Sequence, residues 1–420
     1  MRYLFLPLES SRLIQPPRFR FLDHRHWRLV LIWTSLLLFM LGYVVVMAAW
    51  QSSGDRWLEF SDLLIPRAMD VLIGGWLFFI GSSIGSFLNV VAWRMPRGAS
   101  VNGRSHCPWC DQTLSWKDNW PVFGWLALAG RCRTCRMPIS PRYPIVELAL
   151  GLCFLFVGWR EFYGAGTTLP FHPQDLGRAG ALFMPQLTAE HLWTMIYHLV
   201  AIAVSWAMGL VRFDGHRLPR SLVTVALAMI IAPMLIRPSL AVVPWQVTME
   251  EVWRPQGRYL DAAMRVITGL VAAVIVGRAM SRYLSPTADP KLDPLGKGTA
   301  RLLDLIAILA VAGVVVGWQA ILAVTVLAVL IALAIPLVLP AAHDPLARFA
   351  VALPLALTVQ LGLWRRLHEF DYWPSVGTAP LVTLAWAGAV LIVPGCLTLA
   401  KHKAVDRQPT AGGSDDPPNN

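Results

Sequence analysis

This sequence has few charged residues and few cysteines for its length. Charged residues make up 15% of its 420 residues, hydrophobic residues make up 56%, and only six residues are cysteine. Soluble domains carry about 25% charged and about 45–50% apolar residues, so this composition excludes an ordinary soluble enzyme and a disordered chain. Six cysteines are also too sparse for a disulfide framework. The composition is typical of a membrane protein with many spans.

Long apolar runs fill most of the chain. A spanning helix needs about 20 mostly apolar residues, and ten segments approach that requirement: 29–50, 70–93, 144–159, 191–211, 221–236, 259–280, 302–317, 319–340, 349–364 and 379–400. The fold class is therefore expected to be all-α, a polytopic helical membrane protein of about ten spans. The first span is expected to be a retained anchor, because its apolar run is longer than the core of a signal peptide.

Basic residues gather in alternate loops. The segments 94–142 and 212–220 and both ends of the chain are rich in arginine and lysine, whereas the loops between them carry fewer basic residues, mixed with acids. Loops rich in arginine and lysine stay in the cytoplasm. Both termini and the 94–142 loop are therefore expected to be cytoplasmic. This topology explains the net charge of +11, so no nucleic-acid partner is expected.

Four of the six cysteines form two CxxC pairs. The pairs are Cys107-Pro-Trp-Cys110 and Cys132-Arg-Thr-Cys135, with 21 residues between them. Each pair can direct two thiolates at one cation, and two pairs complete a closed tetrahedral zinc site. The alternatives are a redox pair or uncoordinated thiols, although a reducing compartment disfavours disulfides. We expect a structural zinc ion that folds a small cytoplasmic loop domain.

The region around these cysteines resembles the bacterial type IV prepilin peptidase family, the prepilin leader peptidases/N-methyltransferases. The resemblance covers roughly 74–151 and rests on Gly85-Ser-Phe-Leu-Asn-Val-Val, Arg94-Met-Pro-Arg-Gly, Arg104-Ser-His-Cys-Pro-Trp-Cys, Trp116-Lys-Asp-Asn-Trp-Pro-Val, Gly130-Arg-Cys-Arg-Thr-Cys and Pro138-Ile-Ser-Pro-Arg-Tyr-Pro-Ile-Val-Glu-Leu. Weaker similarity extends to about residue 365. The resemblance implies a multi-pass protein of the bacterial inner membrane that cuts the cytoplasmic leader of pilin-like or pseudopilin precursors.

The family's catalytic pair is altered in this sequence. Members use two aspartates that share a proton, one before a Leu-Pro turn and one in a GxGD motif. Counting back from Pro219 puts the first position at Arg212. No GxGD motif occurs in the sequence, and counting back from Gly313 puts the second position at Leu305. The nearest acids, Asp214 and Asp304, are the candidate catalytic pair, as base and acid. Alternatively, Asp214 is a solvated turn residue and Asp304 a helix N-terminal charge. An arginine beside a carboxylate opposes proton sharing.

Two further residues match family positions implicated in N-methylation from S-adenosylmethionine. They are Gly130, before the second CxxC pair, and Glu147, at the start of a span. Gly130 is also interpretable as a turn glycine before a metal knuckle, and Glu147 as a helix cap or the partner of a cation. The sequence has no nucleotide-binding glycine fingerprint, so the resemblance alone implies this cofactor.

These observations divide the chain into five expected parts. They are a basic segment with an extra anchor (1–69), a peptidase-like N-terminal domain with the cysteine loop (70–160), a peptidase-like helical core (190–365), an added span (366–400) and a disordered tail (401–420).

The leading functional hypothesis is a membrane-embedded aspartic endopeptidase that cleaves prepilin leaders and also N-methylates the new N-terminus. The alternative is a catalytically inactive relative that binds prepilins or assembly proteins as a scaffold, which the missing GxGD and Arg212 favour. A transporter with a zinc-bound loop is a third hypothesis, weakened by the scarcity of ionisable residues in the spans.

Overall fold

The described part of the protein is built from helices. The structure, a computed structural model, describes residues 24–54, 57–162, 168–170, 189–245, 254–285, 297–338 and 344–398. Its α-helices are α1 (His24–Gly54), α2 (Phe60–Arg94), α3 (Phe123–Ala127), α4 (Arg142–Phe162), α5 (Ala189–Phe213), α6 (Arg220–Ile236), α7 (Arg254–Leu284), α8 (Lys297–Val316), α9 (Ala320–Val338), α10 (Pro345–Gly362), α11 (Trp364–His368) and α12 (Pro380–Ile392). Short 3₁₀ turns cover Met95–Arg97 and Pro238–Leu240.

The expected all-α class is confirmed. Each of the ten predicted spans coincides with a helix, and the described residues contain isolated β-bridges but no named strand. Within the residues that the structure describes, eight helices are long and apolar enough to cross a membrane. The other two expected spans correspond to α6, which is apolar but shorter, and α4, which is not among those eight.

The helices α2 and α4 form a close antiparallel pair. A Cβ added at Gly81 of α2 would lie 2.6 Å from the Cβ of Phe154 and 2.7 Å from the carbonyl oxygen of Leu150, both in α4. At Gly85 it would lie 2.9 Å from the Cα of Glu147. These two glycines form the GxxxG pattern of the sequence, and the absence of side chains permits the close approach of the two helices.

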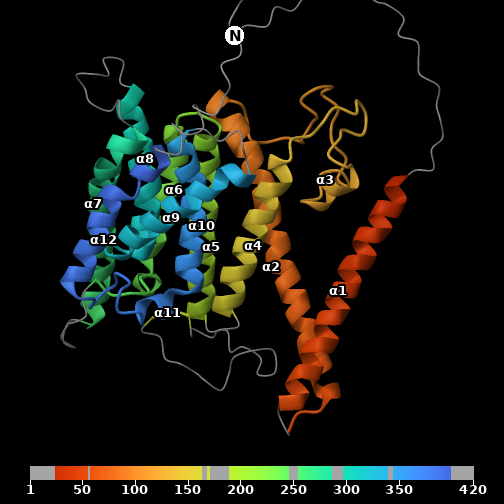
Figure 1. Cartoon of the computed structure of the whole chain (residues 1–420), viewed down its shortest axis with the longest axis horizontal. Coiled ribbons are helices and arrows are strands. Elements are labelled where there is room, and N and C mark those ends of the chain that lie inside the picture. Colours follow the sequence, from red (N-terminus) through yellow and green to blue (C-terminus); the bar gives the residue numbers. More distant parts are fainter. Residues whose placement is uncertain are drawn as a thin grey trace, which may run out of the picture.

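The remaining helices pack into a bundle beside this pair. α5 and α10 lie at its centre, α7 packs on α8, α9 packs on α10, and α12 covers α9 (Figure 1). The α10 residues are almost all buried, which fits a helix surrounded by others. α5 contacts both α2 and α4, so it joins the pair to the bundle.

The helix α1 stands apart from the bundle along most of its length. Figure 1 shows α1 meeting α2 at one end and diverging from it toward the other, where the segment containing α3 lies between α1 and the α2–α4 pair. Near the meeting point, Asp70 of α2 pairs with Arg67 at 2.6 Å and accepts a hydrogen bond from Tyr43 of α1. Arg67 also donates to Gln51 of α1. These polar contacts hold α1 to α2.

Several helix ends and the cysteine loop meet at one end of the molecule. An ion pair joins Arg142, the first residue of α4, to Asp214, directly after α5. A second joins Arg212, in the last turn of α5, to Asp304 of α8. The loop that ends at α4 and the two candidate acids therefore belong to the same end, as the charge pattern predicts.

Candidate functional site

The cysteine loop consists of two knuckles with the same backbone pattern. In the first, Asp111 N–H donates to the Cys107 carbonyl at 2.9 Å. In the second, Arg136 N–H donates to the Cys132 carbonyl at 3.1 Å. Asp111 and Arg136, each next to the second cysteine of its pair, have positive φ angles of 53° and 60°. Each tight turn brings the two cysteines of its CxxC pair to the same side.

The two knuckles bring the four sulfurs into one cluster. All four lie within 4.8 Å of one another, with 3.8 Å between Cys107 and Cys135 and 4.0 Å between Cys110 and Cys132. A tetrahedral zinc ion with Zn–S bonds of about 2.3 Å requires sulfurs roughly 3.8 Å apart. The four cysteines therefore fit a closed zinc site, as the spacing predicts. His106 lies 3.6 Å from Asp111 and does not belong to the cluster.

The close approach of these thiols affects their protonation. Backbone N–H groups of Cys135 and Thr134 lower the pKa of the Cys132 thiol to about 7, against its burial. The backbone N–H of Met137 favours the Cys135 thiolate, but burial and the neighbouring thiols raise the pKa of Cys135 to about 11. Four adjacent sulfurs resist becoming thiolates together, and a divalent cation removes that resistance.

Side chains from α2 and α4 attach the loop to the helix pair. Arg94 donates to the carbonyl oxygens of Asn102 and Arg104, both at 3.1 Å. Glu147 accepts a hydrogen bond of 2.7 Å from the backbone N–H of Val122. Both side chains are largely buried, which strengthens these contacts.

Gly130 also has a structural role in the loop. Its φ angle is +67°, and an added Cβ would lie 2.7 Å from the ring of Trp125. The Trp125 indole in turn donates to the Ile139 carbonyl at 3.0 Å. Only glycine adopts this conformation without strain. Gly130 and Glu147 are thus both engaged within the loop and its attachment, and their role toward S-adenosylmethionine stays a prediction.

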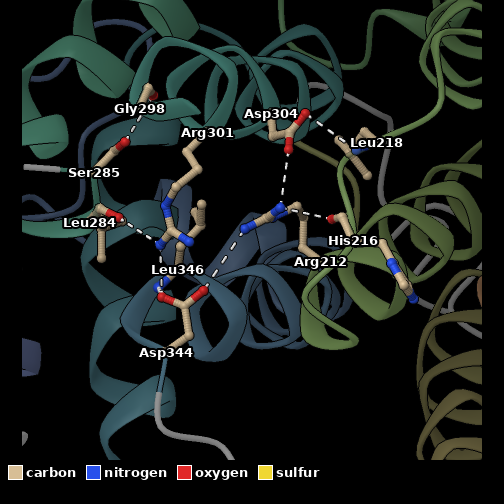
Figure 2. Close-up of polar contacts among 10 residues, drawn as sticks. All are labelled: Arg212, His216, Leu218, Leu284, Ser285, Gly298, Arg301, Asp304, Asp344 and Leu346. Carbon is tan, nitrogen blue, oxygen red and sulfur yellow. Dashed lines mark hydrogen bonds and ion pairs between the residues drawn. The ribbon is translucent and has the colours of Figure 1, made fainter. Parts of the chain in front are cut away.

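The helix ends next to the loop hold a buried network of ion pairs. Figure 2 shows Arg212 between two carboxylates from different helices. It lies 3.2 Å from Asp304 and 3.8 Å from Asp344, and it donates to the His216 carbonyl at 2.7 Å. Arg301 completes the network by pairing with Asp344 at 2.7 Å. Arg212 and Asp304 are buried, whereas Asp344 and Arg301 are partly exposed.

The two candidate acids have different arginine partners. Asp304 uses one carboxylate oxygen for Arg212 and the other for the backbone N–H of Leu218, at 3.3 Å. Asp214 pairs with Arg142 of α4. Among the contacts of the described residues, none joins Asp214 to Asp304. Each carboxylate therefore faces a cation.

Sequence reasoning missed Asp344 and Arg301 as members of this network. Asp344 precedes Pro345 at the start of an apolar run and accepts the N–H of Leu346 at 3.3 Å, which is a helix N-cap. Arg301 lies three residues before Asp304 on the same helix. The N-cap signal was available in the sequence, but the ion-pair partners come from separate helices.

The loop and its two flanking helices are similar to parts of known proteins. The model of the bacterial peptidase A24 N-terminal domain matches residues 79–161. A prepilin leader peptidase/N-methyltransferase of Myxococcus xanthus is 50% identical over 99 residues, which cover 23% of this chain and 29% of that protein. A protein of the same name from Klebsiella pneumoniae is 44% identical over 95 residues, covering 21% of this chain and 42% of that protein.

The similarity is confined to part of each protein. A type 4 prepilin-like proteins leader peptide-processing enzyme of Escherichia coli O78:H11 is 44% identical over 119 residues, covering 23% of this chain and 42% of the relative. The chain thus spans less than half the length of these relatives. No solved structure matches it. Residues 79–161 thus match the bacterial peptidase A24 N-terminal domain, and over this part the chain is similar to prepilin leader peptidases/N-methyltransferases.

Proposed function

We propose that this protein binds prepilin-like precursors in the bacterial inner membrane and no longer cleaves them by an aspartic mechanism. The single observation that carries the proposal is the position of Arg212, which lies within 3.2 Å of Asp304 and 3.8 Å of Asp344. This is the alternative that the sequence raised for a chain without the GxGD motif.

An aspartic protease needs two carboxylates that share one proton, so that one activates water and the other donates a proton. Proton sharing arises because two like charges in contact cannot both ionise cheaply. In the network, two arginines balance two aspartates, and both oxygens of Asp304 already accept hydrogen bonds. A carboxylate held by an arginine gains nothing from sharing a proton with a second acid.

The relatives supply the expected partner. Their names refer to prepilins, and this chain retains the domain that it has in common with them. The four-cysteine loop and the ion-pair network share one end of the bundle, tied by Arg142 and Asp214. We place that end, with both termini, on the cytoplasmic side, where the leader of a precursor would arrive.

A second candidate function is the leading sequence hypothesis, an aspartic peptidase that uses Asp214 and Asp304. Its support is that both acids belong to the same end of the helices as the loop. Catalysis would require Arg142 and Arg212 to release them when a substrate binds. N-methylation with S-adenosylmethionine is a further prediction from the relatives' names, with Gly130 and Glu147 as its proposed residues.

One experiment separates binding from cleavage. Full-length protein in nanodiscs is mixed with a model prepilin, and both capture and leader release are followed, the latter by mass spectrometry. We expect capture without leader release, with the Myxococcus xanthus relative as the positive control for cleavage. Leader release by the wild-type protein that is lost in both Asp214→Asn and Asp304→Asn would establish the peptidase and reject our proposal. The absence of both capture and leader release would reject both functions.

A further inference from the structure

The cysteine loop has an apolar edge that lies against a membrane helix. Trp120 and Phe123 contact Trp33 of α1, with ring centroids 5.2 Å and 5.4 Å apart. Leu126, next to them in α3, is 41% exposed. We define these three loop residues, Trp120, Phe123 and Leu126, as the apolar edge. Its contact with Trp33 fixes where the loop lies along α1.

That contact sets the depth of the apolar edge. The apolar stretch of α1 begins at Val30, and Trp33 follows three residues later. With a rise of 1.5 Å per residue, Trp33 lies about 4.5 Å inside the stretch. Amphipathic elements rest about 5–10 Å into the boundary between lipid headgroups and acyl chains, so Trp33 is just short of that range. We therefore expect the apolar edge to lie at the level of the lipid headgroups around α1.

The same loop is strongly basic and carries exposed tryptophans. Residues 94–142 contain eight arginines and lysines but only two acids, Asp111 and Asp118. Six of these cations are exposed. Arg133 pairs with Asp118, and the other five are Arg97, Arg104, Lys117, Arg131 and Arg136. Trp109 is 64% exposed and Trp116 is 73% exposed, and the Lys117 ammonium lies 5.4 Å from the Trp116 ring centroid.

We propose that the cysteine loop binds the anionic phospholipid headgroups of the leaflet beside α1. Tryptophan side chains favour the membrane interface, and each lysine or arginine near an anionic leaflet adds to the attraction. An acidic soluble protein fits less well, because the apolar edge reaches the depth of the lipid around α1. The interaction is independent of whether the protein binds or cleaves a prepilin.

Hydrogen exchange of the full chain in nanodiscs tests this proposal. One nanodisc contains only phosphatidylcholine, and in the other part of that lipid is replaced by phosphatidylglycerol. We expect the amides of the loop to exchange more slowly with phosphatidylglycerol, by about fivefold for each cation engaged. Soluble glycerol phosphate added to the zwitterionic nanodisc distinguishes a bilayer surface from a free anion and is expected to have no effect.

Two matched variants localise the effect. Lys117→Gln with Arg131→Gln is expected to reduce the slowing by about fivefold for each cation removed, whereas Arg220→Gln with Arg278→Gln, two exposed cations of other cytoplasmic helix ends, is expected to leave it unchanged. Zinc content is measured in parallel. If the first variant loses zinc, the variant Arg104→Gln is used in its place. The proposal would be overturned if the loop amides exchanged equally in the two nanodiscs, or if both variants lost the slowing to the same extent. It would also be overturned if a soluble acidic polypeptide slowed exchange with no dependence on lipid.

Discussion

Arg212 donates a hydrogen bond to Asp304 of α8 and forms an ion pair with Asp344, the N-cap residue of α10. A buried arginine of this kind has lost its hydration and depends on its partners for compensation. Its ion pairs link the end of α5 to the first turns of α8 and to the start of α10. The residue that departs from the family pattern thus holds three helix ends in place.

Removing the arginine alone is expected to destabilise the protein. Arg212→Ala leaves Asp304 buried without its cation, and breaking a buried ion pair costs about 3–5 kcal/mol. The double variant Arg212→Leu with Asp304→Leu removes both charges and is expected to recover most of that loss. Thermal unfolding in nanodiscs measures both. Arg220→Ala, at an exposed arginine, is the control and is expected to stay within about 0.5 kcal/mol of wild type. A single variant as stable as wild type would contradict the importance of the pair.

At the scale of elements, the cysteine loop is a unit whose order depends on its metal site and on three attachments. Its core contains few large apolar side chains, and Trp109 and Trp116 face outward. Arg94 and Glu147 attach it to α2 and α4, and the apolar edge attaches it to α1. Such a short segment needs the cation to fold, because metal affinity serves as folding free energy in small metal domains.

Metal removal is therefore expected to unfold the loop and leave the bundle intact. Wild-type protein should contain one zinc ion per chain, and Cys110→Ser should lose it, because a closed site needs all four thiolates. Elemental analysis measures the metal, and limited proteolysis reports cleavage confined to residues 99–141. Cys396→Ser, at a cysteine outside the cluster, is the matched control and should retain zinc. Retention of zinc in both variants would refute the four-cysteine site.

At the scale of the whole molecule, the two ends of the bundle carry different interactions. One end holds the cysteine loop and the Arg212 network. Toward the other, the buried Glu161 of α4 pairs with His198 of α5 at 2.6 Å, and the backbone N–H of Arg365 donates to the Thr168 carbonyl. The Glu161–His198 pair joins the last residue of the matched domain to the helix that follows it.

The sidedness of these ends is testable with reporter fusions. We expect alkaline phosphatase fused after Gly54 or Glu369 to be active, because both positions are predicted to lie outside the cytoplasm. Fusions after Gly215 or Thr398 should be inactive, and green fluorescent protein at the same sites should give the opposite pattern. An inverted result would place the loop and both acids outside the cytoplasm and exclude cytoplasmic leaders as ligands.

The sequence by itself determined the helices and the metal cluster, because both depend on local pattern. Apolar runs separated by charges located ten of the twelve α-helices in the described part of the chain, and two CxxC pairs fixed the identity of the sulfurs that meet within 4.8 Å. That Arg212 stands at the position of a family aspartate is implied by the resemblance and stays a prediction. The division of the chain into five parts stays a prediction, and its tail, 401–420, lies outside the described residues.

Only the tertiary structure decided the partners of the charged residues. Arg212, Asp304 and Asp344 are separated by 40 or more positions along the chain and meet because three helices end together. Asp214 pairs with Arg142 for the same reason. Periodicity specifies which face of a helix is buried, but the choice of partner depends on how helices from distant parts of the sequence pack, which no local pattern encodes.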